Sequence, residues 1–277
     1  MALVGANVAV AKLLAEDLSV PMIAGLRCLI ACAVLWPLAR VIDGPVVVPR
    51  DVRKNLFWQA AFGTVLYNAA LLAGLRLTGA LEAGLVLASL PAVIALGGWI
   101  FLREALAPRQ WAAVALAAGG MGAIALARGG ESQGSLLGGA LVFAGVCGEA
   151  VYAVLARRVA GRVPVVTASL WMQVFSVALL VPFCLPFLGD VLALAHPRVA
   201  GLLMFHALTA SVVCLLLWYA GLKRVEAGVA GIFTAFLPGT AAAVAIFALG
   251  EHATAVHAAG FGLLLGSVLL ATWPRRR

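Results

Sequence analysis

The chain has 277 residues, of which 64% are hydrophobic and 11% are charged, and its mean hydropathy is +1.10. A soluble domain of this length could not bury so much apolar surface, so these values exclude a soluble protein and indicate one embedded in lipid. The formal net charge is +8. Because the chain has neither aromatic residues interleaved with basic ones nor a glycine-rich phosphate loop, we expect no nucleic-acid partner.

Ten apolar stretches follow one another along the chain, each near the roughly 20 residues that a helix needs to cross a bilayer. The predicted helices span residues 2–16, 21–41, 55–76, 79–102, 109–127, 135–157, 164–187, 198–220, 226–248 and 254–273. A cleaved signal peptide is the alternative interpretation of the first, short stretch, but no basic segment precedes it. The connections are short, so the sequence predicts an all-α integral membrane protein with ten transmembrane helices.

Basic residues indicate how these helices are oriented, because Lys and Arg concentrate in cytoplasmic loops. With the N-terminus inside, 14 of the 19 Lys and Arg residues fall in cytoplasmic loops or the C-terminus, and four fall outside. The remaining one, Arg27, lies within the second predicted helix, and we expect it to pair near the outer interface rather than to bind substrate. Both termini are therefore predicted to be cytoplasmic, in a bacterial inner membrane that the chain crosses many times.

An internal repeat of 147 residues divides the chain into two halves. Matching Ala and Leu residues mean little in so apolar a chain, but a proline (Pro91 and Pro238) and a glutamate (Glu104 and Glu251) also recur at this offset. The two predicted repeats are residues 1–130 and 131–277. Each has an odd number of helices, so the second repeat enters the membrane from the opposite side. Such an inverted repeat is typical of secondary transporters that work by alternating access.

A characteristic run of residues surrounds the proline and the glutamate of each repeat. The first run comprises Leu90-Pro91, Gly97-Gly98-Trp99-Ile100-Phe101-Leu102-Arg103-Glu104, Gln110-Trp111 and Gly119-Gly120. The second comprises Leu237-Pro238, Leu249-Gly250-Glu251, Gly260 and Gly266. These runs resemble the EamA repeat of the drug/metabolite transporter superfamily, and the resemblance covers essentially the whole chain. It implies ten helices around a central cavity lined by helices 1, 3, 4, 6, 8 and 9. Within the superfamily, the chain is most similar to bacterial exporters of aromatic and other neutral amino acids.

The recurring proline and glutamate are candidates for moving parts. Pro91 and Pro238 lie near the middle of the fourth and ninth predicted helices, where a missing N–H and a steric clash predict a kink. Such a kink can act as a hinge or line a cavity, although a static kink is the alternative. Glu104 and Glu251 end the same helices on opposite sides of the membrane and are candidate gate residues. The alternative is that each stabilises the N-terminus of the following helix.

Polar groups inside the spans are the candidate substrate ligands. Glu149 lies near the centre of the sixth predicted helix, with Tyr152 one turn later, and an ionisable residue at such a depth is a functional hypothesis by default. It could bind an amino group or carry a proton, or it could be neutralised by Lys12 or Arg27. Asn7, in the middle of the first helix, is a further candidate.

The third and eighth predicted helices carry matching polar and aromatic stripes. Tyr67 and Asn68 lie on the third, and Ser211 and Trp218 lie on the eighth, which suits a solute with an apolar side chain and a polar head. Polar packing between helices is the alternative. His206 is five residues from Ser211, which turns it off this stripe in an α-helix, and we expect it to be structural. Weaker cavity candidates are Ser89 and Thr234.

No motif indicates enzymatic chemistry, a metal centre or a cofactor. The sequence therefore predicts an alternating-access exporter of small metabolites, with aromatic and other neutral amino acids as the first substrate class. An exporter of drugs or cationic metabolites is the alternative within transport. A non-transporting sensor or scaffold is the alternative of another class, but it leaves the inverted repeat unexplained. The expected partners are a small-molecule substrate and the lipid bilayer, and the sequence leaves the oligomeric state open.

Overall fold

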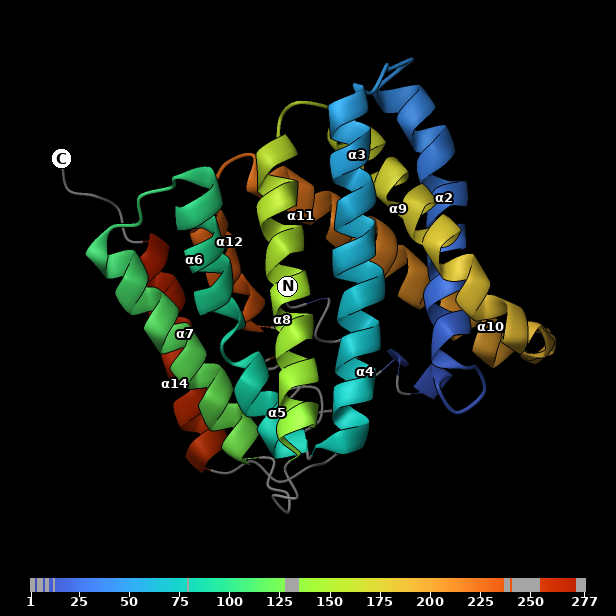
Figure 1. Ribbon diagram of the computed structural model, residues 1–277. Coiled ribbons are helices and arrows are strands. Elements are labelled where there is room, and N and C mark those ends of the chain that lie inside the picture. The colour runs from blue at the N-terminus through green and yellow to red at the C-terminus, as the bar shows by residue number, and fades with distance from the viewer. Residues whose placement is uncertain are drawn as a thin grey trace. The chain divides into compact units, whose positions relative to one another are not determined.

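The computed structural model describes residues 3, 7, 10–11, 13–78, 80–127, 135–236, 240 and 255–272. Throughout this part of the chain the secondary structure is helical, apart from an isolated bridge between Ala160 and Val163 (Figure 1). The elements are α2 (Val20–Ile42), α3 (Arg50–Gln59), η1 (Ala60–Leu66), α4 (Tyr67–Leu77), α5 (Ala80–Leu87), α6 (Leu90–Leu102), α7 (Pro108–Ala127), α8 (Leu136–Val159), α9 (Val165–Cys184), η2 (Leu185–Ala195), α10 (Pro197–His206), η3 (Ala207–Val213), α11 (Cys214–Leu222), α12 (Ala227–Thr234) and α14 (Ala255–Thr272).

Several of these helices are long and apolar enough to cross a membrane. Within the described residues five meet both criteria, and two shorter helices are also apolar. The five are Val20–Ile42, Arg50–Leu77, Leu136–Val159, Val165–Ala195 and Pro197–Leu222. The chain is thus an all-helical, multi-pass membrane protein, while the total of ten spans and the orientation of the termini stay predictions.

The helices form two compact units, and each unit draws on both halves of the sequence. The first unit consists of Leu66–Val154 and Val225–Arg277. In it, α7 packs along α14, and α12 packs against α6 (Figure 1). Buried Ala95, Ala113, Ile232 and Leu264 contribute to its core. Small residues dominate, which lets helix backbones approach closely in lipid.

The second unit consists of residues 3–65 and 155–224. Here α2 packs along α9 and against η3. Buried Leu35, Val166 and Val212 form one of its apolar clusters. Thr167, at the start of α9, donates hydrogen bonds from its amide and its hydroxyl to the Asp43 carboxylate, each 2.7 Å long. This carboxylate therefore ties the end of α2 to the beginning of α9.

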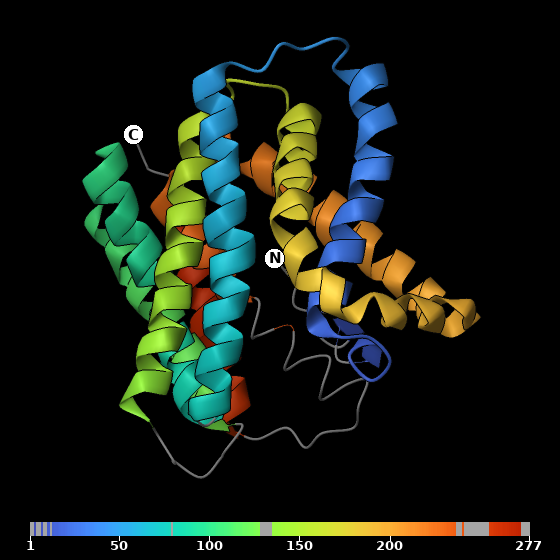
Figure 2. The ribbon, with the colours of Figure 1, turned by 45° about the vertical axis from the view of Figure 1, so that its right-hand side comes forward.

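The 147-residue repeat extends to the hydrogen-bond pattern of the backbone. The segments η1 (60–66) and η3 (207–213) are both π-helical, and they are offset by 147 residues at each end. The α-helices on either side follow the same offset: α3 and α10 before them, and α4 and α11 after them, where each continues the rod without a loop (Figure 2). The duplication therefore includes an unusual local geometry that no residue pattern had indicated.

The fourth predicted helix is divided in the structure. We expected one kinked helix over 79–102, but α5 ends at Leu87 and α6 begins at Leu90. Pro91 stands in the first turn of α6, where its missing N–H would have no partner in any case. The Ser89 amide and hydroxyl both bond to the Val86 carbonyl, at 3.0 and 2.7 Å. The proline therefore starts a new helix instead of bending a continuous one, and its counterpart Pro238 lies outside the described residues.

Candidate functional site

In the first unit, α8 lies close against α4 along a face of small residues. A Cβ atom added to Gly145 would lie 3.4 Å from the Tyr67 carbonyl oxygen. Glu149 and Tyr152 follow Gly145 by four and seven residues, so they lie on the same face of α8. Because Gly145 packs against the turn of α4 that holds Tyr67, Glu149 lies one turn of α8 away from this contact. The structure thus brings three predicted site residues together, with Asn68 next to Tyr67 in the first turn of α4.

Glu104 holds the beginning of a helix from the other repeat. Its Oε2 accepts a hydrogen bond of 2.7 Å from the amide of Ala227, the first residue of α12. An acidic group here stabilises the positive end of the helix. The alternative that we considered for Glu104 was that it stabilises the N-terminus of the following helix, α7. The hydrogen bond is instead made with α12. Gly98 makes this crossing possible, because a Cβ atom there would lie 3.1 Å from the same carboxylate oxygen.

The residue before Glu104 has an unusual backbone conformation. Arg103 is the C-cap of α6 and has a φ of 55°, in the left-handed region that favours glycine. The second repeat has Gly250 at the corresponding position. Arg103 thus holds a backbone conformation that glycine adopts more readily, and glycine stands at its counterpart position.

Two of the weaker candidates use their hydroxyls within their own helices. Thr234 is buried and donates to the Gly231 carbonyl at 2.6 Å. Ser89 donates to Val86 in the same manner, at the break between α5 and α6. Both hydroxyls satisfy the local backbone, so they contribute to the shape of the helices.

In the second unit, Asn7 belongs to a buried polar cluster with the beginning of η3. Its Oδ1 accepts a hydrogen bond from the Thr209 hydroxyl and lies 3.0 Å from the His206 ring nitrogen Nδ1. Its Nδ2 donates to the Leu3 carbonyl at 2.8 Å. Only 2% of Asn7 and 7% of His206 is exposed. His206 therefore has the structural partner that was expected of it.

Ser211 lies in the π-helical segment η3 and is approached from two helices. Its hydroxyl accepts a hydrogen bond of 3.1 Å from Nη1 of Arg27, on α2. Its carbonyl accepts one of 2.7 Å from the Gln173 side chain, on α9. Arg27 therefore has a partner in the rod that runs from Pro197 to Leu222, while its expected position near the outer interface stays a prediction.

The π-helical geometry also corrects the expected placement of His206. We assumed an α-helix between His206 and Ser211, in which residues five apart point in different directions. In a π-helix the hydrogen bonds join residues five apart, so such residues lie nearly one above the other. The prediction that His206 lies off the Ser211 stripe is therefore wrong.

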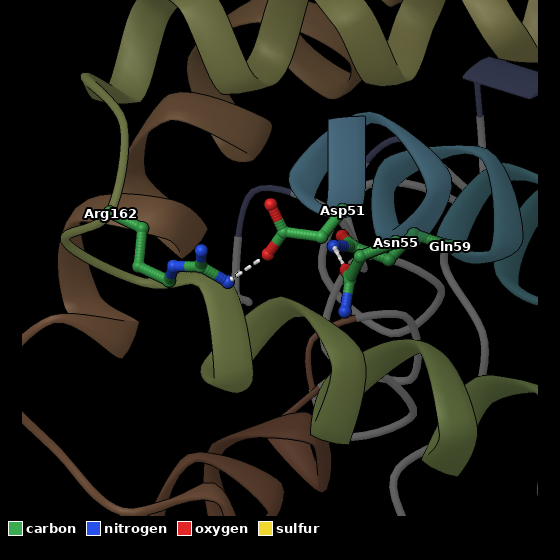
Figure 3. A network of polar contacts seen from close by, with 4 residues as sticks. All are labelled: Asp51, Asn55, Gln59 and Arg162. Atoms are coloured by element: carbon green, nitrogen blue, oxygen red, sulfur yellow. Dashed lines mark hydrogen bonds and ion pairs between the residues drawn. The ribbon is translucent and has the colours of Figure 1, made fainter. Parts of the chain in front are cut away.

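A second polar line runs along α3 and was missed by the sequence analysis. Asp51, Asn55 and Gln59 follow one another at intervals of four residues, so they share one face of the helix (Figure 3). Asp51 forms an ion pair of 2.6 Å with Arg162, and Asn55 accepts a hydrogen bond of 2.6 Å from Gln59. Gln59 is fully buried and accepts one from the Tyr219 hydroxyl. The spacing of four was the signal that could have found this line.

The candidate residues fall into two groups that belong to different units. The first unit holds Tyr67, Asn68, Ser89, Pro91, Glu104, Glu149, Tyr152 and Thr234, and the second holds Asn7, Ser211 and Trp218. Trp218 is partly buried on α11. Glu251, Pro238 and Lys12 lie outside the described residues. Among the residues that are described, no group of His, Cys, Asp and Glu could hold a metal ion.

Comparison with known proteins identifies the family. The chain matches the EamA-like transporter family over residues 1–126 and 136–273. The protein belongs to this family. It is also 31% identical to "Uncharacterized transporter YetK" of Bacillus subtilis (strain 168) over 284 aligned residues, which cover 100% of this chain and 86% of the relative. This EamA-like transporter further resembles a solved crystal structure with a TM-score of 0.79. That likeness covers 98% of this chain and 95% of the other at 20% identity, and it concerns the fold alone.

Proposed function

We propose that this EamA-like transporter exports small amphipathic metabolites by alternating access, with aromatic and other neutral amino acids as the first substrate class. The observation that carries the proposal is the set formed by Glu149, Tyr67 and Tyr152 where α8 crosses α4. A carboxylate that shares a helix face with one tyrosine and lies near the turn of another, on helices able to cross a membrane, suits an ammonium group attached to an apolar side chain. Asn68 adds an amide beside the same ring.

The proposed mechanism uses the repeat. Ten helices, arranged as two inverted repeats with both termini in the cytoplasm of a bacterial cell, would exchange inward-open and outward-open states around this set of residues. Pro91, where α5 and α6 are already separate, would be a hinge, and Pro238 its counterpart. Glu104 would release the α12 amide when its side opens, and Glu251 would serve the opposite face. A green fluorescent protein fused to the C-terminus should fluoresce, because that domain fails to fold after export.

Counterflow in proteoliposomes tests the proposed function. Vesicles loaded with unlabelled phenylalanine should accumulate labelled phenylalanine, and a set of neutral amino acids should compete with it. Glu149→Gln should abolish this accumulation, because it removes the negative charge and keeps the shape. Asp51→Asn is the matched control, because it removes a carboxylate that is exposed at the start of α3. Equal flux in the Glu149→Gln protein and the wild type would refute the assigned role of Glu149.

The same assay addresses the second candidate function. A partly buried carboxylate near tyrosine residues also suits a lipophilic cation that has no carboxylate of its own. Counterflow of tetraphenylphosphonium without counterflow of any amino acid would replace the leading proposal with an exporter of drugs or cationic metabolites. A transmembrane pH gradient that changes the rate of wild-type flux, but not of residual flux in Glu149→Gln, would indicate proton coupling through this residue.

A further inference from the structure

A positive charge lies inside the second unit on a helix able to cross a membrane. Arg27 is the eighth residue of α2, about 10 Å from the start of this helix at 1.5 Å per residue. Its guanidinium is directed to Ser211, which is 1% exposed, and not to the end of either helix. A charged side chain is costly at such a position and persists where it has a function or a charged partner.

No described residue supplies a negative partner for this charge. Arg27 donates one hydrogen bond, to the neutral Ser211 hydroxyl, among the described residues and forms no ion pair with them. Three acidic residues of the same unit are engaged elsewhere: Asp43 with Thr167, Asp51 with Arg162, and Asp190 with the Ser19 amide. The other two, Glu16 and Asp17, are exposed in the turn before α2. A guanidinium has five N–H donors, so most of its capacity is left for another acceptor.

The repeat shows that a charge is not needed to join these helices. Thr64 in η1 corresponds to Ser211 in η3 at the 147-residue offset. The Thr64 hydroxyl lies 3.2 Å from the Ser176 hydroxyl on α9, so in that copy a pair of neutral hydroxyls joins the π-helical segment to its neighbour. In the other copy, the Arg27 guanidinium on α2 makes the corresponding contact, with the Ser211 hydroxyl. The two copies thus differ in the very group that could bind an anion.

The surroundings of Arg27 also favour an anionic group. Ser211 accepts from Arg27 and leaves its own hydroxyl proton for an acceptor, whereas the Thr209 hydroxyl is directed to the Phe205 carbonyl and to Asn7. The Gln173 amide donates to the Ser211 carbonyl, so this oxygen already has a partner. A planar guanidinium matches the two oxygens of a carboxylate, and such a bidentate pair gives both affinity and orientation.

We propose that Arg27, together with the Ser211 hydroxyl, forms the subsite that binds the carboxylate group of a transported monocarboxylate. The inference rests on the proposed function, in which the transported solute carries a carboxylate, and it concerns residues of the second unit alone. The Ser211 hydroxyl orients the guanidinium through the bond it accepts. Solutes that carry a carboxylate then bind more tightly than the corresponding amines.

Binding of three related probes to the purified, full-length protein tests this subsite. The probes are phenylalanine, 3-phenylpropanoate, which lacks the amino group, and 2-phenylethylamine, which lacks the carboxylate. Titration would be followed by thermal stabilisation at constant ionic strength. Arg27→Gln should weaken binding of the two carboxylates by about 10- to 100-fold, the range expected for loss of a charged hydrogen bond. Binding of the amine should stay unchanged.

Three further variants keep the test decisive. Arg40→Gln removes a cation from the last turn of the same helix, where it lies over Trp36, and should leave all three affinities as in the wild type. Arg27→Lys keeps the positive charge but lacks the planar group that can donate two parallel hydrogen bonds to a carboxylate. It should therefore weaken carboxylate binding less than Arg27→Gln does. If Arg27→Gln elutes as an aggregate from a sizing column, Arg27→Lys and Ser211→Ala carry the comparison, with reduced carboxylate affinity expected in both.

The outcomes separate this inference from the proposed function. Phenylalanine counterflow in the wild type, with carboxylate affinity unchanged in the folded Arg27 variants, would overturn the subsite and leave amino-acid transport intact. Absence of phenylalanine counterflow, with 3-phenylpropanoate binding that depends on Arg27, would support the subsite and remove amino-acid export. Absence of 3-phenylpropanoate binding to the wild type would overturn the subsite.

Discussion

Two adjacent glycines on α7 allow a sharp test of the contact between α7 and α14. A Cβ atom at Gly120 would lie 2.9 Å from Leu264 Cγ and 3.0 Å from the Gly260 carbonyl oxygen. A Cβ atom at Gly119 would have Leu263 Cδ1 as its nearest neighbour, at 4.0 Å. The leucine could adopt another rotamer, but a backbone carbonyl cannot yield unless α14 moves. We therefore expect Gly120→Ala to be destabilising and Gly119→Ala to be tolerated.

The size of the effect follows from a comparison of the two variants. Alanine is a better helix former than glycine by about 1 kcal/mol, and both variants gain this amount because both positions lie inside α7. Overpacking of a close contact costs about 1–3 kcal/mol, and only Gly120→Ala incurs it. The free energy of unfolding should therefore be about 1–3 kcal/mol lower in Gly120→Ala than in Gly119→Ala.

Unfolding in mixed micelles measures this difference. Each purified variant would be titrated with sodium dodecyl sulfate, with helix content followed by far-UV circular dichroism and the two curves compared at equal lipid concentration. Gly119→Ala should unfold at or above the wild-type midpoint, and Gly120→Ala below that of Gly119→Ala. Coincident curves for the two variants would refute the tight contact between Gly120 and α14.

Three further predictions concern hydrogen-bonded groups. Tyr219→Phe should lower the free energy of unfolding by about 1–3 kcal/mol in the same detergent titration, because it leaves the buried Gln59 oxygen without its donor. Glu104→Ala should cost about 0.5–2 kcal/mol through loss of the α12 cap, and the Ala227 amide should exchange with deuterium faster than in the wild type, whereas unchanged exchange would contradict the cap. Asp51→Asn should not shift the unfolding midpoint at low or high salt, because its ion pair is exposed.

The helical architecture was largely predictable, because lipid requires long apolar helices and the repeat is visible in the sequence. The expected boundaries of the second and fifth helices, 21–41 and 109–127, agree closely with α2 and α7. The break at Ser89 was less predictable, because a proline can bend a helix or begin one, and the surrounding contacts decide between them. The membrane class and the family were therefore accessible from the sequence, whereas the division of the fourth helix was not.

The candidate site was predictable only where α-helical spacing applies. Glu149 and Tyr152 share a face of α8, as their spacing of three residues indicated. His206 was misplaced for another reason: it stands at the start of a π-helical segment, and a one-residue shift in hydrogen bonding leaves no mark on composition or hydropathy. Pairs of residues on distant helices, such as Glu104 and Ala227, can be recognised only once the tertiary structure is known.

The matched π-helical segments bear on the history of the chain. A π-helical segment arises when one extra residue is accommodated within an α-helix, and two separate insertions would have no reason to fall 147 residues apart. A simpler history places one insertion in an ancestor of half the length, before its gene was duplicated and fused. The ancestor would then already have carried the hydroxyl-bearing π turn now seen at Thr64 and Ser211, and the arginine on α2 would be a later acquisition of one copy.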